Sequence, residues 1–251
     1  MTRNRIILAL VAILAIGAGA YFAYDNVLRG DAVAPLSLPS TSPTSVASGA
    51  PSAAASDPAV TQPSTAPADG AIAGTWTVTT GSEAGYRVRE QLANLPAESD
   101  AVGRTSDVTG GMTLVPAGDG AQLTAGDLTV DTTTITSNES RRDNRLRTEG
   151  LQTDQFPTAT FKLTQPVDIP AAALAGAATD LTLVGDLTVH GVTKSVQIPA
   201  QAQITNGQIA VTGSISFPLS DFQIQTPNVG GFIVSIADQG ALEFLVVFAK
   251  A

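Results

Sequence analysis

The 251-residue sequence contains no cysteine and a single histidine, His190. The lack of cysteine excludes disulfides, zinc–thiolate sites and a lipid-modified cysteine. With one histidine, a metal site built from several imidazoles is impossible, and histidine-based catalysis would depend on His190 alone. Basic residues are few, because 13 Lys and Arg stand against 22 Asp and Glu, a net charge of −9. This balance argues against nucleic acid as a partner, since phosphate binding requires clustered cations.

The familiar catalytic motifs are absent as well. The chain has no Gly-x-Ser-x-Gly elbow, no glycine-rich phosphate loop with its lysine and no His-Glu-x-x-His pair. His190 lies at the end of a predicted strand, where a turn or capping role is favoured, and Asp221 and Asp238 lie in turn-like contexts. We therefore predict no catalytic residue, no metal ion and no cofactor. A hydrolase or isomerase acting on a lipid would have to depend on His190.

A basic head and a long apolar run open the chain. Residues 1–5 include Arg3 and Arg5, and residues 6–24 carry no charge. As a helix this run is about 28 Å long, close to the ~30 Å of membrane hydrocarbon, and the arginines favour a cytoplasmic amino terminus. We predict a single transmembrane anchor in the cytoplasmic membrane, with the rest of the chain extracytoplasmic. The alternative is a signal peptide cleaved after Ala18-Gly19-Ala20, which would leave a secreted or periplasmic protein.

The next stretch, residues 25–71, is rich in Ala, Ser, Pro and Thr. Such a composition cannot bury enough apolar surface to order itself, so we predict a disordered linker. In polyproline II form, at about 3.1 Å per residue, it would reach on the order of 100 Å. It is typical of a spacer that lifts a domain off the membrane; the alternative is a remnant of export.

Apolar and polar residues alternate in the remaining domain, residues 72–251, most clearly over 181–217. Because successive strand residues point to opposite faces, this period of two predicts a meander with one apolar face. Asn206-Gly207 is typical of a two-residue type I′ turn. That turn would pair Ile204 with Ile209, Ala202 with Val211, Ala200 with Gly213, Ile198 with Ile215 and Val196 with Phe217. A slip of one residue would put apolar side chains on both faces, so the register is specified.

Near the end of the domain, Asp238-Gln239-Gly240 predicts a three-residue hairpin loop. This loop would set Val234 opposite Phe244 and Phe232 opposite Val246. The domain then holds about eight or more strands, and a sheet with one apolar face must cover another layer or close on itself. We predict an all-β fold, an antiparallel up-and-down barrel of about eight strands whose interior holds side chains or one small ligand. A sandwich is the alternative.

The alternation breaks at residues 136–147. Thr136 and Glu139 have the spacing of a helix capping box, and a polar run follows in which Asp143 and Arg147 are four residues apart. We predict a short helix near one end of the barrel. Its arginines are Arg141, Arg142, Arg145 and Arg147. They form either a solvated, ion-paired face or an electropositive rim for an anionic head group such as a phosphate.

Three segments, in this order, resemble the YceI-like family. Residues 140–146 (Ser-Arg-Arg-Asp-Asn-Arg-Leu) are similar to its Arg-Asp-x-His-Leu pattern, and residues 156–161 (Phe-Pro-Thr-Ala-Thr-Phe) to Phe-Pro-x-x-x-Phe. Residues 185–194 (Gly-Asp-Leu-Thr-Val-His-Gly-Val-Thr-Lys) resemble its longest and most specific pattern, Gly-x-Leu-Thr-x-His-Gly-Val-Thr-Lys. The resemblance covers residues 74–250. It implies a lipocalin-like barrel, exported from bacteria, whose elongated pocket binds a polyisoprenoid chain, and it implies no established catalytic reaction.

One residue departs from the family's first pattern, because Arg145 stands where the pattern carries His. A permanently charged guanidinium would favour a phosphate over a neutral quinone ring. We expect a membrane-tethered protein of the bacterial cell envelope that holds or carries a long isoprenoid lipid of the quinone or polyprenyl phosphate type. The alternative is a non-carrier interaction module, a solid barrel displayed on a stalk at the cell surface.

The parity of the apolar face gives the residues expected to line the ligand cavity. They are Trp76, Val88, Phe161, Leu183, Leu187, Ile198, Val211, Ile215, Phe217, Phe232, Val234 and Phe244. Ordinary core packing is the alternative for each of them, because parity does not distinguish a filled interior from a hollow one.

Overall fold

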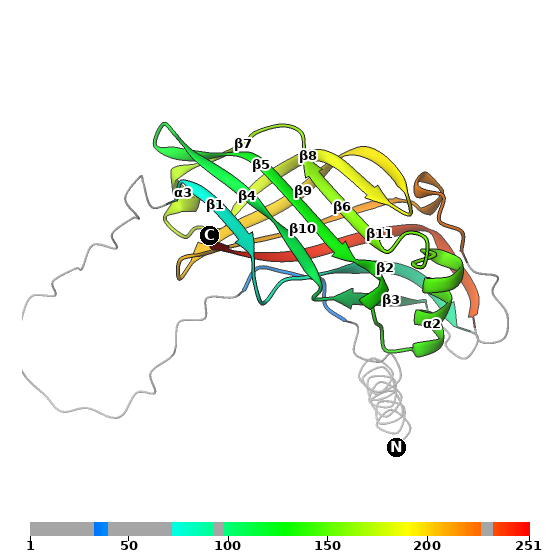
Figure 1. Cartoon of the computed structure of the whole chain (residues 1–251). Helices are drawn as coiled ribbons and strands as arrows, with labels where there is room; N and C mark the ends of the chain where they lie inside the picture. Colours follow the sequence, from blue (N-terminus) through cyan, green and yellow to red (C-terminus); the bar gives the residue numbers. More distant parts are fainter. Residues whose placement is uncertain (1–32, 40–71, 93–97, 227–232) are drawn as a thin grey trace, which may run out of the picture.

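The alternating sequence forms long antiparallel strands (Figure 1). The computed structural model describes residues 33–39, 72–92, 98–226 and 233–251, apart from the side chains of residues 92, 233 and 234. The expected anchor at 6–24, the linker apart from residues 33–39, and Phe232 lie outside the described residues. Among those that are described, no helix is both long and apolar enough to cross a membrane.

Strands make up most of the domain. In chain order they are β1 (Gly74–Val78), β2 (Glu83–Leu92), β3 (Ser99–Thr105), β4 (Val108–Ala117), β5 (Gly120–Asp131), β6 (Thr158–Leu163), β7 (Val167–Ile169), β8 (Thr179–Val189), β9 (Val192–Thr205), β10 (Gln208–Pro218) and β11 (Ile233–Lys250). The helical segments are η2 (Thr132–Thr134), α2 (Ser140–Arg145), the π-helical η3 (Leu146–Gly150), α3 (Ala171–Leu174) and η4 (Leu219–Phe222).

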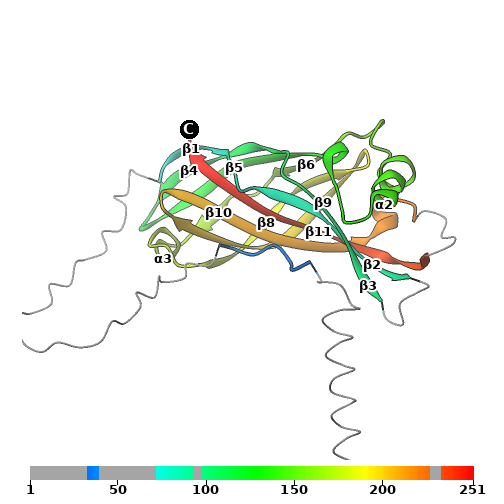
Figure 2. The same ribbon diagram turned by 90° about the horizontal axis from the view of Figure 1, so that it is seen from below.

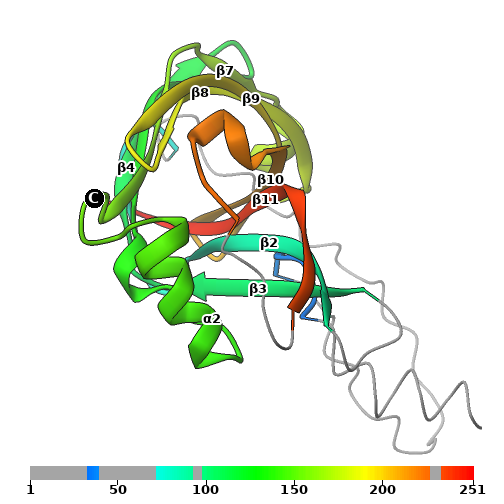
Figure 3. The ribbon, with the colours of Figure 1, turned by 90° about the vertical axis from the view of Figure 1, so that its right-hand side faces the viewer.

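Eight of the strands close into a barrel, seen end-on in Figure 3. Their order is β1-β4-β5-β6-β8-β9-β10-β11, and β11 pairs with β1 at Trp76–Lys250 and Val78–Phe248 to complete the ring. Every pairing around the ring is antiparallel. The prediction of a closed antiparallel barrel is confirmed, and the sandwich alternative is wrong.

At one end of the barrel, which we call the wide end, two further strands add to the wall. There β2 takes the place of β1 beside β11, pairing with it from Ile233 to Leu245, and β3 continues the wall from β2. Arg104 of β3 bridges to Thr136, so the segment that precedes α2 joins the same wall. Figures 2 and 3 show β2, β3 and α2 together at this end of the molecule.

The meander forms with the expected turn and part of the expected register. Asn206 and Gly207 have φ values of 53° and 75°, as a type I′ turn requires. The pairs Ile204–Ile209, Ala202–Val211 and Ala200–Gly213 are confirmed. The ladder ends there, because β10 continues along β11 to Pro218 whereas β9 continues along β8 to Val192. The two outer pairs, Ile198–Ile215 and Val196–Phe217, were therefore predicted wrongly.

The hairpin expected at Asp238-Gln239-Gly240 does not exist. These residues lie inside β11, which is a single strand of 18 residues. The register against β2 shifts between Ile236 and Gly240, so the extra residues form a bulge. A bulge and a tight turn share the same sequence signal, and here β11 pairs with β2 on both sides of the irregular residues, so the chain continues as one strand. The pairing of Val234 with Phe244 was therefore wrong, and Phe244 pairs with Gly213 and Ala84.

The short helix begins three residues later than a capping box at Thr136 would require. Glu139 is the N-cap, and its carboxylate accepts from the backbone N–H of Arg141. Thr136 is instead held by main-chain hydrogen bonds to Arg104. Asp143 is buried and accepts from the backbone N–H and the hydroxyl of Ser137, at 3.0 and 2.6 Å. Asp143 therefore fixes the helix to the wide end. Its carboxylate binds Ser137, and not Arg147 four residues further along the helix.

Candidate functional site

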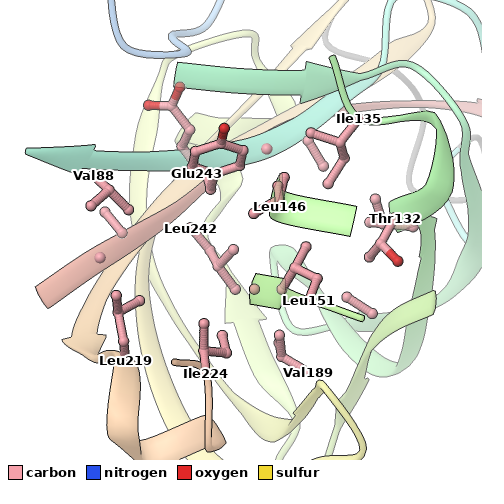
Figure 4. Close-up of a pocket in the computed structure, with 18 of the residues that line it drawn as sticks. Val88, Thr132, Ile135, Leu146, Leu151, Val189, Leu219, Ile224, Leu242 and Glu243 are labelled. Atoms are coloured by element: carbon pink, nitrogen blue, oxygen red, sulfur yellow. The ribbon is translucent and has the colours of Figure 1, made fainter. Parts of the chain in front are cut away.

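A cavity occupies the barrel at the wide end. Its volume is about 200 Å³. By the same measure one water molecule needs roughly 10–15 Å³, so the cavity is far larger than a single water site. Figure 4 shows its apolar wall, to which β2, β8, β11, the helical segments and their connections contribute. The labelled apolar residues around it are Val88, Ile135, Leu146, Leu151, Val189, Leu219, Ile224 and Leu242.

A second pocket of about 70 Å³ adjoins the first on the side towards the other end of the barrel. Leu128, Phe161, Phe244 and Val246 line both pockets, so the two spaces lie end to end along the interior. The second pocket is bounded by residues of β4, β5, β8, β9, β10 and α3. The two pockets together are therefore elongated, and Phe161 and Phe244 lie where they adjoin.

Small residues explain why the wide end is hollow. Ala84, Ala101, Ala159 and Gly240 line the first cavity, where larger side chains would fill it. Gly103 has a related role, because a Cβ there would lie 2.4 Å from the ring of Tyr86. That ring therefore packs directly over the backbone of β3. Removing side-chain volume from strand residues leaves space that the surrounding barrel cannot collapse to fill.

Three polar side chains, Tyr86, Glu90 and Arg142, form what we call the polar corner of this apolar cavity. All three line it. Glu90 is only 3% exposed, and its carboxylate accepts from Arg142 Nη2 in an ion pair. Arg142 Nη1 also donates to Asn138 Oδ1 at 2.9 Å and to Ser137 Oγ at 3.2 Å. The positive charge of Arg142 is thus matched by a buried carboxylate.

Two donors of the polar corner are unsatisfied. Tyr86 Oη and Arg142 Nε are buried and have no hydrogen-bond partner among the described residues. Burial raises the pKa of Tyr86 to about 12, with Arg142 acting in the opposite direction, so the phenol is neutral and able to donate. Leaving a buried donor unpaired costs about 1–3 kcal/mol, and a ligand with an acceptor oxygen would remove that cost.

The structure brings most of the predicted lining residues to the cavity walls. Five line the first cavity only, namely Val88, Leu187, Ile198, Ile215 and Phe217. Leu183 and Val211 line the second pocket, and Phe161 and Phe244 line both. Trp76 lines neither, because it is buried in the core and its indole donates to the Ile72 carbonyl at 3.0 Å. Phe232 and the side chain of Val234 lie outside the described residues.

The predicted arginine rim is divided. Arg142 and Arg145 line the first cavity, whereas Arg141 is exposed and lies outside its lining. Arg147 donates to the carbonyls of Thr133 and Ile135, at 3.2 and 3.3 Å, and so stabilises the turn before α2. Neither a solvated, ion-paired face nor an electropositive rim describes all four arginines, since Arg142 is paired inside the barrel and Arg147 binds main-chain carbonyls.

His190 is a turn residue, as predicted. It has a φ of 51° and forms with Gly191 the two-residue turn between β8 and β9. Its ring packs edge-on against Phe156, with centroids 4.6 Å apart, and Nδ1 lies 3.1 Å from the carbonyl oxygen of Phe222. A Cβ at position 191 would lie 2.5 Å from Phe156, so glycine is required there. The Phe-Pro and His-Gly motifs thus meet to hold the turn.

The sequence interpretation missed the polar corner. Tyr86 and Glu90 have the same strand parity as Val88, so alternation placed both on the inner face. The sequence signal for the polar corner was Glu90, a charged residue at an inward-facing strand position. The partner of Glu90 was not predictable, because Arg142 is 52 residues away along the chain and meets it only in the fold. Among the described residues, no group of three His, Asp or Glu side chains is placed to hold a metal ion.

The family follows from comparison with known proteins. A family model for the YceI-like domain matches residues 76–248. The chain belongs to the YceI-like family. Among curated relatives, a UPF0312 protein of Shewanella oneidensis is 34% identical over an alignment of 134 residues that covers 49% of this chain and 64% of the relative. One from Vibrio parahaemolyticus is 40% identical over 111 residues, covering 41% of this chain and 55% of the relative. The chain thus spans less than two thirds of the length of these relatives.

Solved structures share the YceI-like fold. A polyisoprenoid binding domain from Saccharophagus degradans has a TM-score of 0.54 at 16% identity, covering 71% of this chain and 99% of that domain. BcnA from Burkholderia cenocepacia has a TM-score of 0.51 at 18% identity, covering 68% of this chain and 98% of that protein. At these identities the likeness concerns the fold alone.

Proposed function

We propose that this YceI-like protein binds a long isoprenoid lipid inside its barrel, with the tail in the elongated hollow and the head at the polar corner. The observation that carries the proposal is an apolar cavity that adjoins a second apolar pocket at Phe161 and Phe244. The name of the Saccharophagus domain, which shares the fold, supports the same ligand class. The proposal includes no chemical step, and the protein acts by holding or carrying the lipid.

Burial of the tail supplies the binding energy. Each buried CH₂ contributes about 0.8 kcal/mol, so three five-carbon units would gain roughly 12 kcal/mol before the cost of immobilising the chain. No specific polar contact is needed for such an affinity. Polar contacts would instead decide which end of the lipid enters which part of the cavity.

The polar corner favours a head group that accepts hydrogen bonds without carrying a full charge. Glu90 already balances Arg142, and the two unsatisfied donors, Tyr86 Oη and Arg142 Nε, call for an acceptor oxygen. A quinone carbonyl supplies one without bringing an uncompensated charge into an apolar cavity, which would be costly. We therefore propose a quinone-type head in preference to the phosphate that Arg145 suggested from sequence.

The location remains part of the same proposal. An apolar run at 6–24 with arginines before it supports a membrane anchor and an extracytoplasmic barrel. An anchored barrel would exchange its lipid with the membrane that holds it, which suits a ligand of very low solubility in water.

Displacement of an environment-sensitive apolar dye from the full-length protein in detergent tests the proposal. Three competitors separate its parts: a quinone with an isoprenoid tail, a polyprenol with the same tail, and the quinone ring alone. We expect both tailed lipids to displace the dye, the tailed quinone more tightly, and the ring alone to have little effect. Failure of every tailed lipid to displace the dye would leave the barrel without the proposed function.

A further inference from the structure

A short piece of the expected linker lies on the outer wall of the barrel. Residues 33–39 run along the outside of the sheet, as Figures 1 and 2 show in blue. Arg87 Nη2 donates to the Val33 carbonyl at 2.8 Å, and Arg104 Nη2 donates to the Ala34 carbonyl at 2.5 Å. Further along, Thr212 Oγ1 donates to the Leu36 carbonyl at 3.1 Å. The donors come from β2, β3 and β10, so the segment crosses this face of the barrel.

Arg87 and Arg104, the two arginines that bind this segment, are held in place by a buried carboxylate. Glu243 of β11 is only 4% exposed although its carboxylate meets the two arginines that bind the segment. Arg104 Nη2 lies 2.7 Å from Glu243 Oε1, and Arg87 Nε lies 3.4 Å from Glu243 Oε2. Arg87 also pairs with Asp100 at 3.0 Å. A guanidinium has several donors in a fixed plane, so each arginine can bind a carboxylate and still offer an N–H to a main-chain carbonyl.

Gly85 makes this arrangement possible. It lies in one row of the sheet between Glu243 of β11 and Arg104 of β3, pairing with both. A Cβ at position 85 would lie 2.9 Å from Cγ of Arg104 and 2.1 Å from the Gly103 carbonyl oxygen. The missing side chain therefore lets the arginine cross β2 and reach its carboxylate. The docking face is thus a prepared set of donors, not a chance contact of a loose chain.

The segment itself is suited to lie extended on such a face. Ala34 and Leu38 each precede a proline, which restricts them to extended backbone. Leu36 and Leu38 are half-buried, whereas Ser37 between them is exposed, so alternate side chains face the wall. Because Pro35 has no N–H, the segment also leaves fewer main-chain donors without partners.

We propose that residues 33–39 form a strap that fixes the barrel close to the membrane, with its wide end nearest the lipid surface. The position of the membrane rests on the anchor at 6–24 that the proposed function includes. Only residues 25–32 separate that anchor from the strap, and eight residues reach at most about 29 Å when fully extended. This is a fraction of the reach expected of the whole 25–71 linker.

The direction of the strap gives the orientation. Its first residues, Val33 and Ala34, bind Arg87 and Arg104 on β2 and β3, the strands that wall the first cavity. The tether from the anchor therefore arrives at the wide end, and the polar corner lies on the side from which a membrane lipid would enter. The strap thus adds to the lipid-binding proposal a fixed approach between cavity and membrane.

Spin labels test the strap without reference to the membrane. Because the chain has no cysteine, Ser37→Cys with Ser214→Cys gives two unique, exposed labelling sites on the strap and on β10. Electron double resonance on the full chain in detergent should give one narrow distance distribution. Leu36→Asp should broaden it, by placing a charge against the wall, and Leu36→Met should retain it. A broad distribution in the parent pair would overturn the strap, as would a Leu36→Asp result identical to the parent.

Energy transfer in phosphatidylcholine vesicles with a head-group acceptor dye tests the orientation. A donor at Ser220→Cys in η4, beside the first cavity, should transfer more than one at Ala172→Cys in α3, beside the second pocket. Leu36→Asp should reduce this difference. Equal transfer from the two sites of a vesicle-bound chain would overturn the orientation. A chain that does not bind vesicles would overturn the anchor and the orientation together, while the spin-label result would still decide the strap.

Discussion

Individual residues decide what the cavity can recognise. Most of its wall is aliphatic or aromatic and would accept any apolar chain of suitable length. Tyr86 and Arg142 each contribute a buried donor without a partner, and Glu90 balances the arginine's charge. Because unsatisfied buried donors are uncommon in folded proteins, we assign these to a ligand head.

Removing the phenol hydroxyl tests that assignment. Tyr86→Phe should lower the affinity for a tailed quinone about tenfold, equivalent to about 1.4 kcal/mol, because one hydrogen bond is lost. The affinity for a polyprenol without a ring should change much less. Dye displacement measures both. An equal loss for the two ligands would mean that Tyr86 acts only through the shape of the cavity.

The same residue should give the protein a distinct alkaline stability profile. Burial raises the pKa of Tyr86 from 10 to about 12, so the folded state holds the phenolic proton more tightly than the unfolded state. The resulting stability is fully present below pH 10 and is lost as the pH rises towards 12, by up to about 1.4 kcal/mol per pH unit. Urea unfolding of the parent and Tyr86→Phe should therefore differ by a constant amount below pH 10 and diverge above it, with the parent losing more. A constant difference through pH 12 would contradict this.

Breaking the buried ion pair should be costly. Glu90→Leu leaves Arg142 without its carboxylate inside the wide end, and we expect a loss of about 3 kcal/mol in the free energy of unfolding. Glu90→Leu with Arg142→Met should recover part of that loss. The control is Glu98→Gln, because Glu98 pairs with Arg89 at 3.9 Å with both side chains more than half exposed. We expect a change below about 0.5 kcal/mol there. Equal effects at the two sites in urea titration would show that the pair at Glu90 is no more important than a surface pair.

At the scale of elements, the turns and the alternation were predictable and the long-range strand partners were not. Asn206-Gly207 specified its turn locally, so the three pairs nearest to it were right. Farther from the turn, β10 stays with β11 and β9 with β8, and no local signal marks where they part. The bulge at Asp238-Gln239-Gly240 has the sequence signal of a hairpin loop, and only the pairing with β2 shows that β11 continues.

Two positions on β10 distinguish how far a lipid tail enters. Ile215 lines the first cavity and Val211 only the second pocket. Ile215→Phe should weaken binding of short- and long-tailed quinones alike, about tenfold or more, by occupying the space of one or two methylene groups. Val211→Phe should weaken only the long-tailed ligand. Dye displacement with tails of two and of eight isoprene units measures this, and a Val211→Phe effect that does not depend on tail length would contradict an end-to-end tail.

At the scale of the whole molecule, the closed barrel followed from the sequence because one apolar face must be enclosed. That the interior is hollow did not follow, since the same parity describes Trp76 in the packed core and Leu187 at the cavity. Arg142 joins the cavity only through long-range contacts, namely its ion pair with Glu90 of β2 and the bridge between Arg104 of β3 and Thr136 before α2. Residues 33–39 likewise have the composition of the linker. Their place on the barrel wall is shown only by the hydrogen bonds that their carbonyls accept from side chains of β2, β3 and β10.

Native mass spectrometry of the full-length protein, purified from a bacterial membrane in mild detergent, tests the central claim most directly. The account predicts a one-to-one adduct that organic extraction removes and that fragments in five-carbon steps, as an isoprenoid tail does. Protein that carries no adduct, and that takes up neither a tailed quinone nor a polyprenol when these are added, would contradict it.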